Sequence, residues 1–308
     1  MEKKHLIKEI QLLTKKKNAV ILGHYYQIPE IQDISDFIGD SLALSQKAAN
    51  TQADIIVFAG VHFMAETAKI LNPTKKVLLP DLNAACSLAD ACQFADLKQF
   101  KALHPDHKVI SYINCSAEVK TLSDLICTSG NALKLVEQFP KDEKIIFAPD
   151  KNLGAYINRI TGRNMLLWDG SCHIHDQLTD QQLLRIKEKY PNAKMIAHPE
   201  CNPAVLLLAD FVGSTAAMLN FIQKDSSQSY IVATETGIAH QMQKLCPTKT
   251  FYIATMDESC ACNDCPYMKL NTLEKLYACL LNETPEIQLP TDIMDQARKP
   301  IEAMLARS

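Results

Sequence analysis

Residues Ala19-Val-Ile-Leu-Gly-His24 form a short apolar run that ends on a histidine. An apolar run of this length, without alternating polar residues, is typical of a strand buried on both faces of a parallel sheet. Residues 36–41 and a helical pattern follow, then further apolar runs at 54–60 and 76–81, and then Cys86. The stretch therefore predicts the first strand of an α/β unit.

The same order of segments occurs three times along the chain. The second series covers residues 108–114, 125–130, 144–150 and 164–170 before Cys172, and the third covers 194–200, 210–215, 229–237 and 250–257 before Cys265. The opening runs start near Val20, Val109 and Met195, which gives a repeat of about 90 residues. Strands that alternate with helical patterns predict parallel sheets with helices on both faces.

We therefore predict an α/β fold of three similar αβα (Rossmann-like) domains with parallel sheets, in a pseudo-threefold arrangement around a central cluster and active site. The first unit is predicted to comprise residues 1–86 with 270–308, the second residues 87–172, and the third residues 173–269. A polar amphipathic helix is predicted over residues 3–17, before the first strand.

The composition is that of a soluble globular protein. The chain has 308 residues, of which 47% are hydrophobic and 22% charged, and its formal net charge is −3. This charge gives no electrostatic reason to expect a nucleic-acid partner or an acidic membrane surface. No stretch approaches the ~18 consecutive apolar residues of a membrane span, and the first residues lack the apolar segment of a signal peptide. We therefore expect a cytoplasmic protein with no nucleic-acid or membrane partner.

Eleven cysteines are unusual in such a chain. Because the cytosol keeps most thiols reduced, they are not expected to form a disulfide framework. Four of them are predicted to be plain core residues, since free cysteine buries readily as a small hydrophobe: Cys92, Cys127, Cys246 and Cys279.

Polar side chains end the opening strand of each unit. They are His24 and Tyr26 in the first unit, Tyr112 and Asn114 in the second, and His198 and Glu200 in the third. Ligands of open α/β sheets bind beyond the carboxyl ends of the strands. If the three units face one another around an axis, all six side chains point into one cavity.

Hydroxyl residues stand at the start of the next helical segment of each unit: Ser41, Ser129, and Ser214 with Thr215. Taken singly, each serine is better interpreted as a helix N-cap. Three helix N-termini around one cavity would nevertheless suit a small molecule with two or three anionic groups, because free N–H groups and the helix dipole favour anions.

Three loops bring Cys86, Cys172 and Cys265 to the same place. Three thiolates from separate loops fit a [4Fe–4S] cluster, one per chain, in which one iron has no protein ligand. Zinc held by three cysteines and a histidine or glutamate remains an alternative. Cys265 is favoured as the third ligand because it directly precedes Pro266, whereas Cys260 and Cys262 are either a redox pair or spare thiols.

Other polar residues are given weaker or structural interpretations. Glu66 and Lys69 share a helical pattern and are predicted to lie on a solvated face. Glu235, at a strand end, is a candidate for the cavity wall, and His240 is a weaker one. No site role is expected for the remaining histidines: His5, His62, His104, His107 and His173.

Taken together, the motifs resemble the quinolinate synthase family along nearly the whole chain. The matching segments are Gly23-His-Tyr-Tyr26, Gly39-Asp-Ser41, Tyr112-Ile-Asn114, Thr128-Ser-Gly130, Gly170-Ser-Cys-His-Ile-His175, His198-Pro-Glu-Cys201, Asp210-Phe-Val-Gly-Ser-Thr215, Thr234-Glu-Thr-Gly237 and Cys265-Pro-Tyr-Met268. Any one of them is a weak signal, but the ordered set is specific. Two departures from the family pattern are the spacing Cys-x-Cys-x-x-Cys before Pro266, and Cys115 where a hydroxyl residue is more usual.

The resemblance implies a reaction and a site. Iminoaspartate and dihydroxyacetone phosphate would condense to quinolinate, phosphate and two waters, with the open iron acting as a Lewis acid in NAD biosynthesis. An L-aspartate oxidase or dehydrogenase would supply the iminoaspartate. The cluster ligands would be Cys86, Cys172 and Cys265.

The resemblance also assigns roles to the cavity residues. Tyr26 and Glu200 would transfer protons, and His175 would orient the substrate beside the cluster, so that these residues and His198 form the catalytic set. The substrate would be bound by His24, Ser41, Tyr112, Asn114, Ser129, His198, Glu200, Ser214 and Thr215.

Two other functions remain as alternatives. The first is a hydro-lyase of the aconitase type, which also uses an open iron but needs no phosphate substrate. The second is an iron–sulfur or thiol redox sensor built around Cys260, Cys262 and Cys265, which would have no use for the polar residues at the strand ends.

Overall fold

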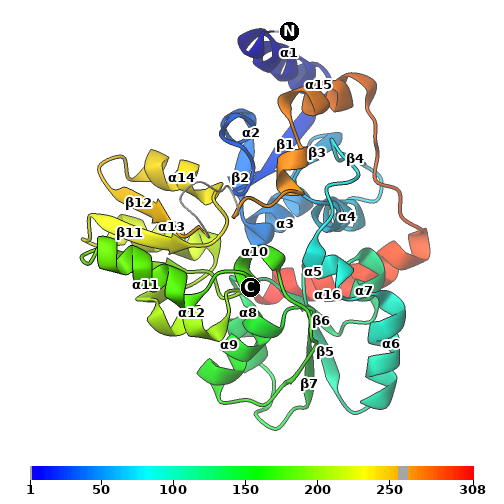
Figure 1. Ribbon diagram of the computed structural model, residues 1–308. Helices are drawn as coiled ribbons and strands as arrows, with labels where there is room; N and C mark the ends of the chain where they lie inside the picture. Colours follow the sequence, from blue (N-terminus) through cyan, green and yellow to red (C-terminus); the bar gives the residue numbers. More distant parts are fainter. Residues whose placement is uncertain (1, 256–262) are drawn as a thin grey trace.

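Three parallel sheets of four strands organise the computed structural model, which describes residues 2–255 and 263–308 (Figure 1). The strand orders are β2-β1-β3-β4, β6-β5-β7-β8 and β10-β9-β11-β12, so the same topology occurs three times. The predicted α/β fold of three similar αβα units is confirmed. In every sheet the opening strand lies second in the order, next to the centre.

The first unit is the N-terminal part of the chain. It contains α1 (Lys3–Lys16), β1 (Ala19–His24), α2 (Pro29–Ile34), β2 (Phe37–Gly39), α3 (Ser41–Asn50), β3 (Ile55–Ala59), α4 (His62–Leu71) and β4 (Lys76–Leu78). Strand β1 pairs with β2 and β3, so that Leu22 lies opposite Phe37 on one side and Phe58 on the other. Strand β3 is buried at every position, as expected of a strand covered on both faces.

The second unit has two helices before its first strand. It contains α5 (Ser87–Asp90), α6 (Phe94–Leu103), β5 (Lys108–Tyr112), α7 (Ala117–Thr121), β6 (Leu125–Cys127), α8 (Ala132–Glu137), β7 (Ile145–Ala148), α9 (Lys151–Thr161) and β8 (Leu166–Leu167). Helix α9 begins where the Asp150 carboxylate accepts a hydrogen bond from Leu153 N, and it ends at Gly162, whose φ of 64° favours glycine.

The third unit follows the same plan. It contains α10 (His173–Asp176), α11 (Asp180–Lys189), β9 (Lys194–Ala197), α12 (Pro203–Leu208), β10 (Phe211–Val212), α13 (Thr215–Lys224), β11 (Ser229–Ala233), α14 (Ile238–Leu245) and β12 (Thr250–Ile253). Cys260 and Cys262, interpreted above as a redox pair or spare thiols, lie outside the described residues.

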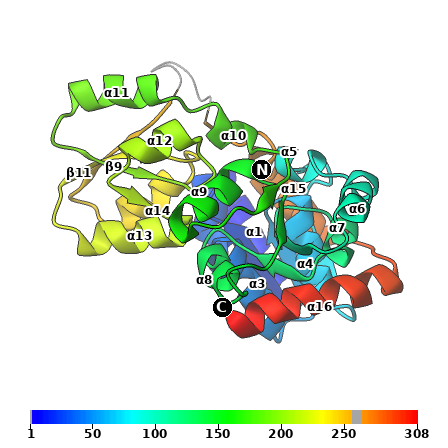
Figure 2. The same cartoon turned by 90° about the horizontal axis from the view of Figure 1, so that it is seen from below.

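The chain then returns to the first two units. A short 3₁₀ helix, Met268–Leu270, leads to α15 (Leu273–Asn282), which packs on α1, and to α16 (Thr291–Arg307). Helix α16 contacts α7, β6 and α4, and Figure 2 shows it along the edge of the first two units, away from the third. The predicted boundaries of the three units stay a prediction.

The interior follows the sheets. One continuous apolar core joins the first and second units, and includes Leu22, Phe58, Ile110 and Phe147, while smaller clusters flank the third sheet. The four cysteines predicted as core residues are all buried. No helix among the described residues is both long and apolar enough to cross a bilayer.

The prediction of a solvated face for Glu66 and Lys69 is wrong. Both side chains are buried on α4, which is covered by α7 and α16. Glu66 Oε2 accepts a hydrogen bond from Ala117 N at 2.9 Å, and Lys69 Nζ donates to Lys75 O at 2.8 Å and lies 3.1 Å from Glu286 Oε1. Burial of these charges comes from packing of the second unit, which helical spacing alone does not show.

Candidate active site

The three units meet around one cavity. Its wall includes all six polar residues from the ends of the opening strands, His24, Tyr26, Tyr112, Asn114, His198 and Glu200, and it encloses about 680 Å³ with its mouth included. Parallel strands present their carboxyl ends at one edge of a sheet, so three sheets facing one axis place these side chains together. The predicted single cavity is therefore confirmed.

The predicted hydroxyl residues are placed less uniformly. Ser41 and Thr215 are the first residues of α3 and α13 and line the cavity, and Ser129 lines it from the loop before α8. Ser214 is not among the lining residues, because its hydroxyl caps α13 by accepting from Ala217 N.

Asp40 is a cavity residue that the sequence analysis missed. It caps α3 by accepting a hydrogen bond from Ala43 N at 3.0 Å, and it also accepts one from the Ser214 hydroxyl of the third unit. Burial raises the pKa of Asp40, while these hydrogen bonds act against that shift. The N-caps of two helices from different units thus contact each other.

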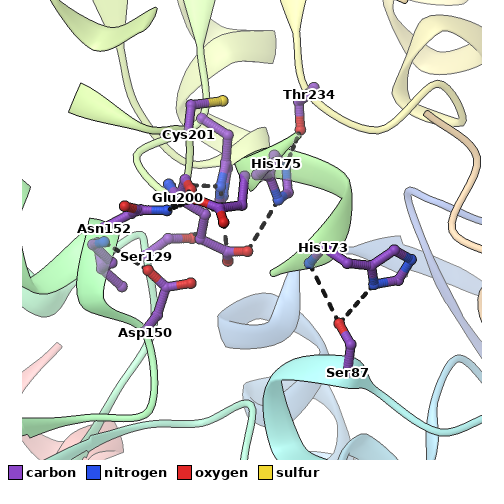
Figure 3. A network of polar contacts seen from close by, with 12 residues as sticks. Ser87, Ser129, Asp150, Asn152, His173, His175, Glu200, Cys201 and Thr234 are labelled. Atoms are coloured by element: carbon purple, nitrogen blue, oxygen red, sulfur yellow. Dashed lines mark hydrogen bonds and ion pairs between the residues drawn. The ribbon is translucent and has the colours of Figure 1, made fainter. Parts of the chain in front are cut away.

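Glu200 is the centre of a buried polar network. Its Oε1 accepts from Tyr112 Oη at 2.5 Å and lies 3.7 Å from His198 Nδ1, and its Oε2 lies 3.0 Å from His175 Nδ1. Burial opposes ionisation of Glu200, but His198, His175 and the hydrogen bonds outweigh it and lower the pKa. Figure 3 shows Glu200 with His175 on one side and Ser129 nearby.

Two histidines and two tyrosines near Glu200 are held neutral. Burial lowers the pKa of His24 and of His198 to about 3. Burial, with the Glu200 charge, raises the pKa of Tyr26 and of Tyr112 well above the ordinary value of tyrosine. At neutral pH the ionised Glu200 therefore lies beside two neutral imidazoles and two neutral phenols, which suits general acid–base chemistry.

The three predicted ligand cysteines line the same cavity. Cys86 directly precedes α5, Cys172 directly precedes α10, and Cys265 lies in the loop before the 3₁₀ helix. Burial raises the pKa of Cys86 to about 12 and of Cys265 to about 11, and each of these thiols further raises the pKa of a neighbour. Thiols that oppose one another's ionisation this way are stabilised as thiolates by a cationic centre among them.

One tighter group could hold a metal by itself. The ligand atoms of Cys172, His175 and Glu200 all lie within 4.8 Å of one another. Such a mixed set also suits zinc, so the geometry leaves the zinc alternative in place.

Two residues of the segment Thr234-Glu-Thr-Gly237 belong to the site. The fully buried Thr234 hydroxyl lies 2.8 Å from Tyr26 Oη and 2.8 Å from His175 Nε2. Glu235 lines the cavity, as expected, and its carboxylate accepts from Cys265 N at 3.0 Å and pairs with Lys269 Nζ at 2.8 Å. The sequence analysis quoted this segment but gave Thr234 no role, because a threonine at a strand end is an ordinary residue.

One histidine lies elsewhere than expected, and the weaker candidate His240 does not line the cavity. His173 lines the cavity, although no role was predicted for it, and its Nδ1 lies 2.6 Å from Ser87 Oγ (Figure 3). His240 is not among the lining residues, and its Nε2 lies 2.9 Å from Asp33 Oδ1 between α14 and α2.

Comparison with known proteins shows the family of this chain. The family model described as quinolinate synthetase A protein matches residues 8–306. Quinolinate synthase from Synechocystis sp. is 60% identical over 303 residues, which cover 98% of this chain and 95% of the relative. Quinolinate synthase from Chloroherpeton thalassium is 58% identical over 304 residues, which cover 98% of this chain and 94% of the relative. The chain therefore belongs to the quinolinate synthase family of enzymes.

Proposed function

We propose that this enzyme condenses iminoaspartate with dihydroxyacetone phosphate to give quinolinate, phosphate and two waters, as a step of NAD biosynthesis. The observation that carries the proposal is the single cavity in which a carboxylate, neutral imidazoles and phenols face three cysteines from three loops. The atoms balance, because the seven carbons and one nitrogen of the two substrates all appear in quinolinate.

The cavity offers complementary groups for a dicarboxylate. Ser41 and Thr215 are the first residues of ten-residue helices and line the cavity, so their hydroxyls can donate to carboxylate oxygens there. Ser129 Oγ lies 3.2 Å from His198 Nε2, and the pair can bind one further oxygen. Asn114 Oδ1 is buried without a hydrogen-bond partner in the described part of the chain, so an N–H or O–H of the ligand would satisfy it.

Tyr26 and Glu200 are proposed to transfer the protons. Ionised Glu200 can accept a proton from the condensing substrate, and neutral Tyr26 can donate one to a leaving oxygen. Positioned acids and bases of this kind are worth roughly 10²–10⁴-fold in rate. His24, whose ring is 4.6 Å from the ring of Tyr26, is proposed to hold the substrate against that residue.

Cys86, Cys172 and Cys265 would hold one [4Fe–4S] cluster per chain. The donor set fits, since three thiols from three separate loops line one cavity and a cationic centre among them would stabilise their thiolate forms. When bound, the cluster supplies a Lewis-acidic iron that can accept an oxygen leaving group. Glu235 positions the Cys265 loop through the hydrogen bond from Cys265 N.

The unstable substrate implies a supplier. Iminoaspartate would come from an L-aspartate oxidase or dehydrogenase, as a functional link between two enzymes. The proposed partners are otherwise the two small-molecule substrates.

The first experiment measures iron and acid-labile sulfide in protein purified without oxygen, beside Cys265→Ala and the control Cys279→Ala. Cys279 is buried in the core formed with α15, away from the cavity. We expect about four irons and four sulfides per chain in the wild type and the control, and loss of both in Cys265→Ala. Zinc without sulfide, or a full cluster in Cys265→Ala, would contradict the proposed ligand set.

The second experiment supplies both substrates to the loaded enzyme. Formation of quinolinate with one phosphate per product supports the proposal. Dehydration of a hydroxy acid without phosphate release would favour the hydro-lyase instead, and a loaded cluster without any turnover would favour a redox sensor.

A further inference from the structure

The turn that carries Tyr26 is held by a side chain from outside the turn. The turn runs from His24 to Gln27 and is closed by Gln27 N, which donates a hydrogen bond to His24 O at 3.0 Å. Gln32 Nε2, on α2, donates to Tyr25 O at 2.9 Å and to Gln27 O at 2.8 Å. One amide therefore holds the backbone carbonyls on both sides of Tyr26.

The same amide also reaches the third unit. Gln32 is only 2% exposed, and its Nε2 lies 2.9 Å from Gly237 O as well. Its Oε1 accepts a hydrogen bond at 2.8 Å from Gln241 Nε2 of α14, which lies beside α2 (Figure 1). Since carbonyl oxygens can only accept, the NH₂ group must face them, and this determines the orientation of the amide. Gln32 therefore joins the turn of the first unit to the third unit.

The Tyr26 backbone is also contacted directly by other segments. A Cβ atom at Gly237 would lie 2.8 Å from the carbonyl carbon and the Cα of Tyr26, and 2.9 Å from Glu235 Oε2. Because the φ of Gly237 is −58°, which any residue adopts, this close approach and not the backbone conformation requires glycine. Lys269 Nζ, in the 3₁₀ helix, donates to Tyr26 O at 2.7 Å. The turn is thus enclosed by groups from α2, the third unit and the 3₁₀ helix.

We propose that Gln32 is a positioning residue for Tyr26, because its amide ties the turn to Gly237 and so fixes the phenol in the cavity. Gln32 is not among the residues that line the cavity, so it acts through the turn. The proposal rests on the proposed function for the role of Tyr26 as a proton donor. Misplacing a catalytic group by about 1 Å can cost roughly 10²-fold in rate, so a fixed turn favours turnover.

The position requires the hydrogen-bond donors of an amide. Its two N–H bonds serve three carbonyl oxygens, while its own oxygen accepts from Gln241. A methionine has a similar length and fills the same space, but it donates no hydrogen bond. Gln32→Met therefore releases the turn from Gly237, and it moves the Tyr26 phenol without removing it.

The test is a double-mutant cycle of Gln32→Met and Tyr26→Phe, measured on anaerobic holoenzymes with kcat calculated per intact cluster. We expect Gln32→Met to lower kcat about 10–10²-fold, with KM within about threefold of the wild type. Tyr26→Phe alone should lower kcat about 10²–10⁴-fold. Because Gln32 acts through the phenol, adding Gln32→Met to Tyr26→Phe should change kcat by less than about threefold.

The matched control is Gln241→Met. It removes the neighbour that donates to Gln32 Oε1, but it leaves the three contacts of Gln32 Nε2 in place, so kcat should stay within about threefold of the wild type. The proposal is overturned if Gln32→Met keeps kcat within about threefold, if the effects of Gln32→Met and Tyr26→Phe multiply in the double variant, or if Gln241→Met is as slow as Gln32→Met.

A second substitution tests the same turn if Gln32→Met does not fold. Gly237→Ala keeps every donor, but its added methyl group displaces the Tyr26 backbone. It should lower kcat about 10–10²-fold in the wild-type background and less than about threefold beside Tyr26→Phe. Equal losses in the two backgrounds, or no loss in either, would overturn the proposal.

Failure of the proposed function would be seen separately. If the loaded wild type forms no quinolinate, the proposed reaction is wrong, and the place of Tyr26 is then followed by its ¹⁹F resonance in protein labelled with fluorotyrosine. The resonance is assigned by its absence in Tyr26→Phe. It should shift or broaden in Gln32→Met and stay in place in Gln241→Met. An unchanged resonance in Gln32→Met, or an equal change in Gln241→Met, would overturn the positioning role by itself.

Discussion

The active-site cavity and the contact between α4 and α7 both bury ionisable groups, and they satisfy them differently. In the cavity, Glu200 is surrounded by the side chains of Tyr112, His175 and His198, each of which can exchange a proton. Between α4 and α7, Glu66 accepts from the backbone of Ala117, and Lys120 donates to the backbone of Cys115. The one imidazole near Glu66 among the described residues, His62 at 3.6 Å, is exposed to solvent and does not face the cavity.

The difference shows that buried charge alone does not mark a catalytic site. A carboxylate held by a backbone N–H fixes one helix against another, because the amide cannot take up or release the proton. A carboxylate held by imidazoles and phenols beside an open cavity can change its protonation state during a reaction. The partners of a buried acid therefore indicate its role better than its burial does.

The largest expected effect is on turnover, and it tests whether Glu200 takes part in the reaction. Glu200→Gln keeps the size of the side chain but removes the base, so we expect quinolinate formation to fall by roughly 10²–10⁴-fold. The free energy of unfolding should fall, since the lowered pKa of Glu200 means that its charge stabilises the folded state, and the variant lacks that charge. Steady-state kinetics and urea denaturation of the anaerobic protein check this. A variant with wild-type turnover would remove Glu200 from the mechanism.

Substitution of Glu66, the buried acid between α4 and α7, is expected to change stability and not turnover. Glu66→Leu leaves Ala117 N–H buried without an acceptor, which should cost about 1–3 kcal/mol in the free energy of unfolding. Glu66→Gln, which keeps an acceptor oxygen, is the matched control and should cost less. Both variants should retain wild-type kcat and KM once folded and loaded. A loss of kcat in Glu66→Gln at unchanged stability would mean that the two regions are coupled.

The third effect is the dependence of stability on pH, which is small per pH unit. Burial lowers the pKa of His24 and His198 to about 3, so the unfolded chain binds protons between about pH 6.5 and 3 that the folded chain does not. Their contribution is fully present above pH 6.5 and is lost as the pH falls. Near pH 5 each histidine should make the free energy of unfolding fall by about 1.4 kcal/mol more for each pH unit of acidification.

The measurement is urea denaturation at several pH values for the wild type, His24→Gln, His198→Gln and the exposed control His5→Gln. We expect a shallower pH dependence in the first two variants, and in the control the same slope as in the wild type. Equal slopes in all four proteins would show that neither imidazole is held neutral by the fold.

The sequence predicted the parts of the molecule that depend on local patterns. Strands that are buried on both faces have continuous apolar sequences. The polar residue that ends such a sequence lies at the carboxyl end of the strand, where ligands of parallel sheets bind. This rule placed His24, Tyr112 and His198 correctly in the cavity wall. The threefold repetition then allowed Cys86, Cys172 and Cys265 to be grouped, although they are separated by more than 80 residues.

The parts that the sequence did not predict depend on packing between units. Glu66 and Lys69 have the spacing of a solvated helical pair, and only the second unit and α16 bury them. The Thr234 hydroxyl contacts Tyr26, which is 208 residues away in the chain. A contact between residues so far apart leaves no signal in the local sequence. Thr234 therefore cannot be distinguished in the sequence from any other threonine at a strand end.

The repeated topology also has a consequence for how such a site could arise. Tyr26, Asn114 and Glu200 stand at equivalent places, each two residues after the residue that ends or directly follows an opening strand: His24, Tyr112 and His198. A trimer of identical subunits would have to place the same side chain at all three. When the three units are encoded in one gene, each can mutate independently of the others. Three units descended from one ancestral unit can then place a phenol, an amide and a carboxylate around one substrate.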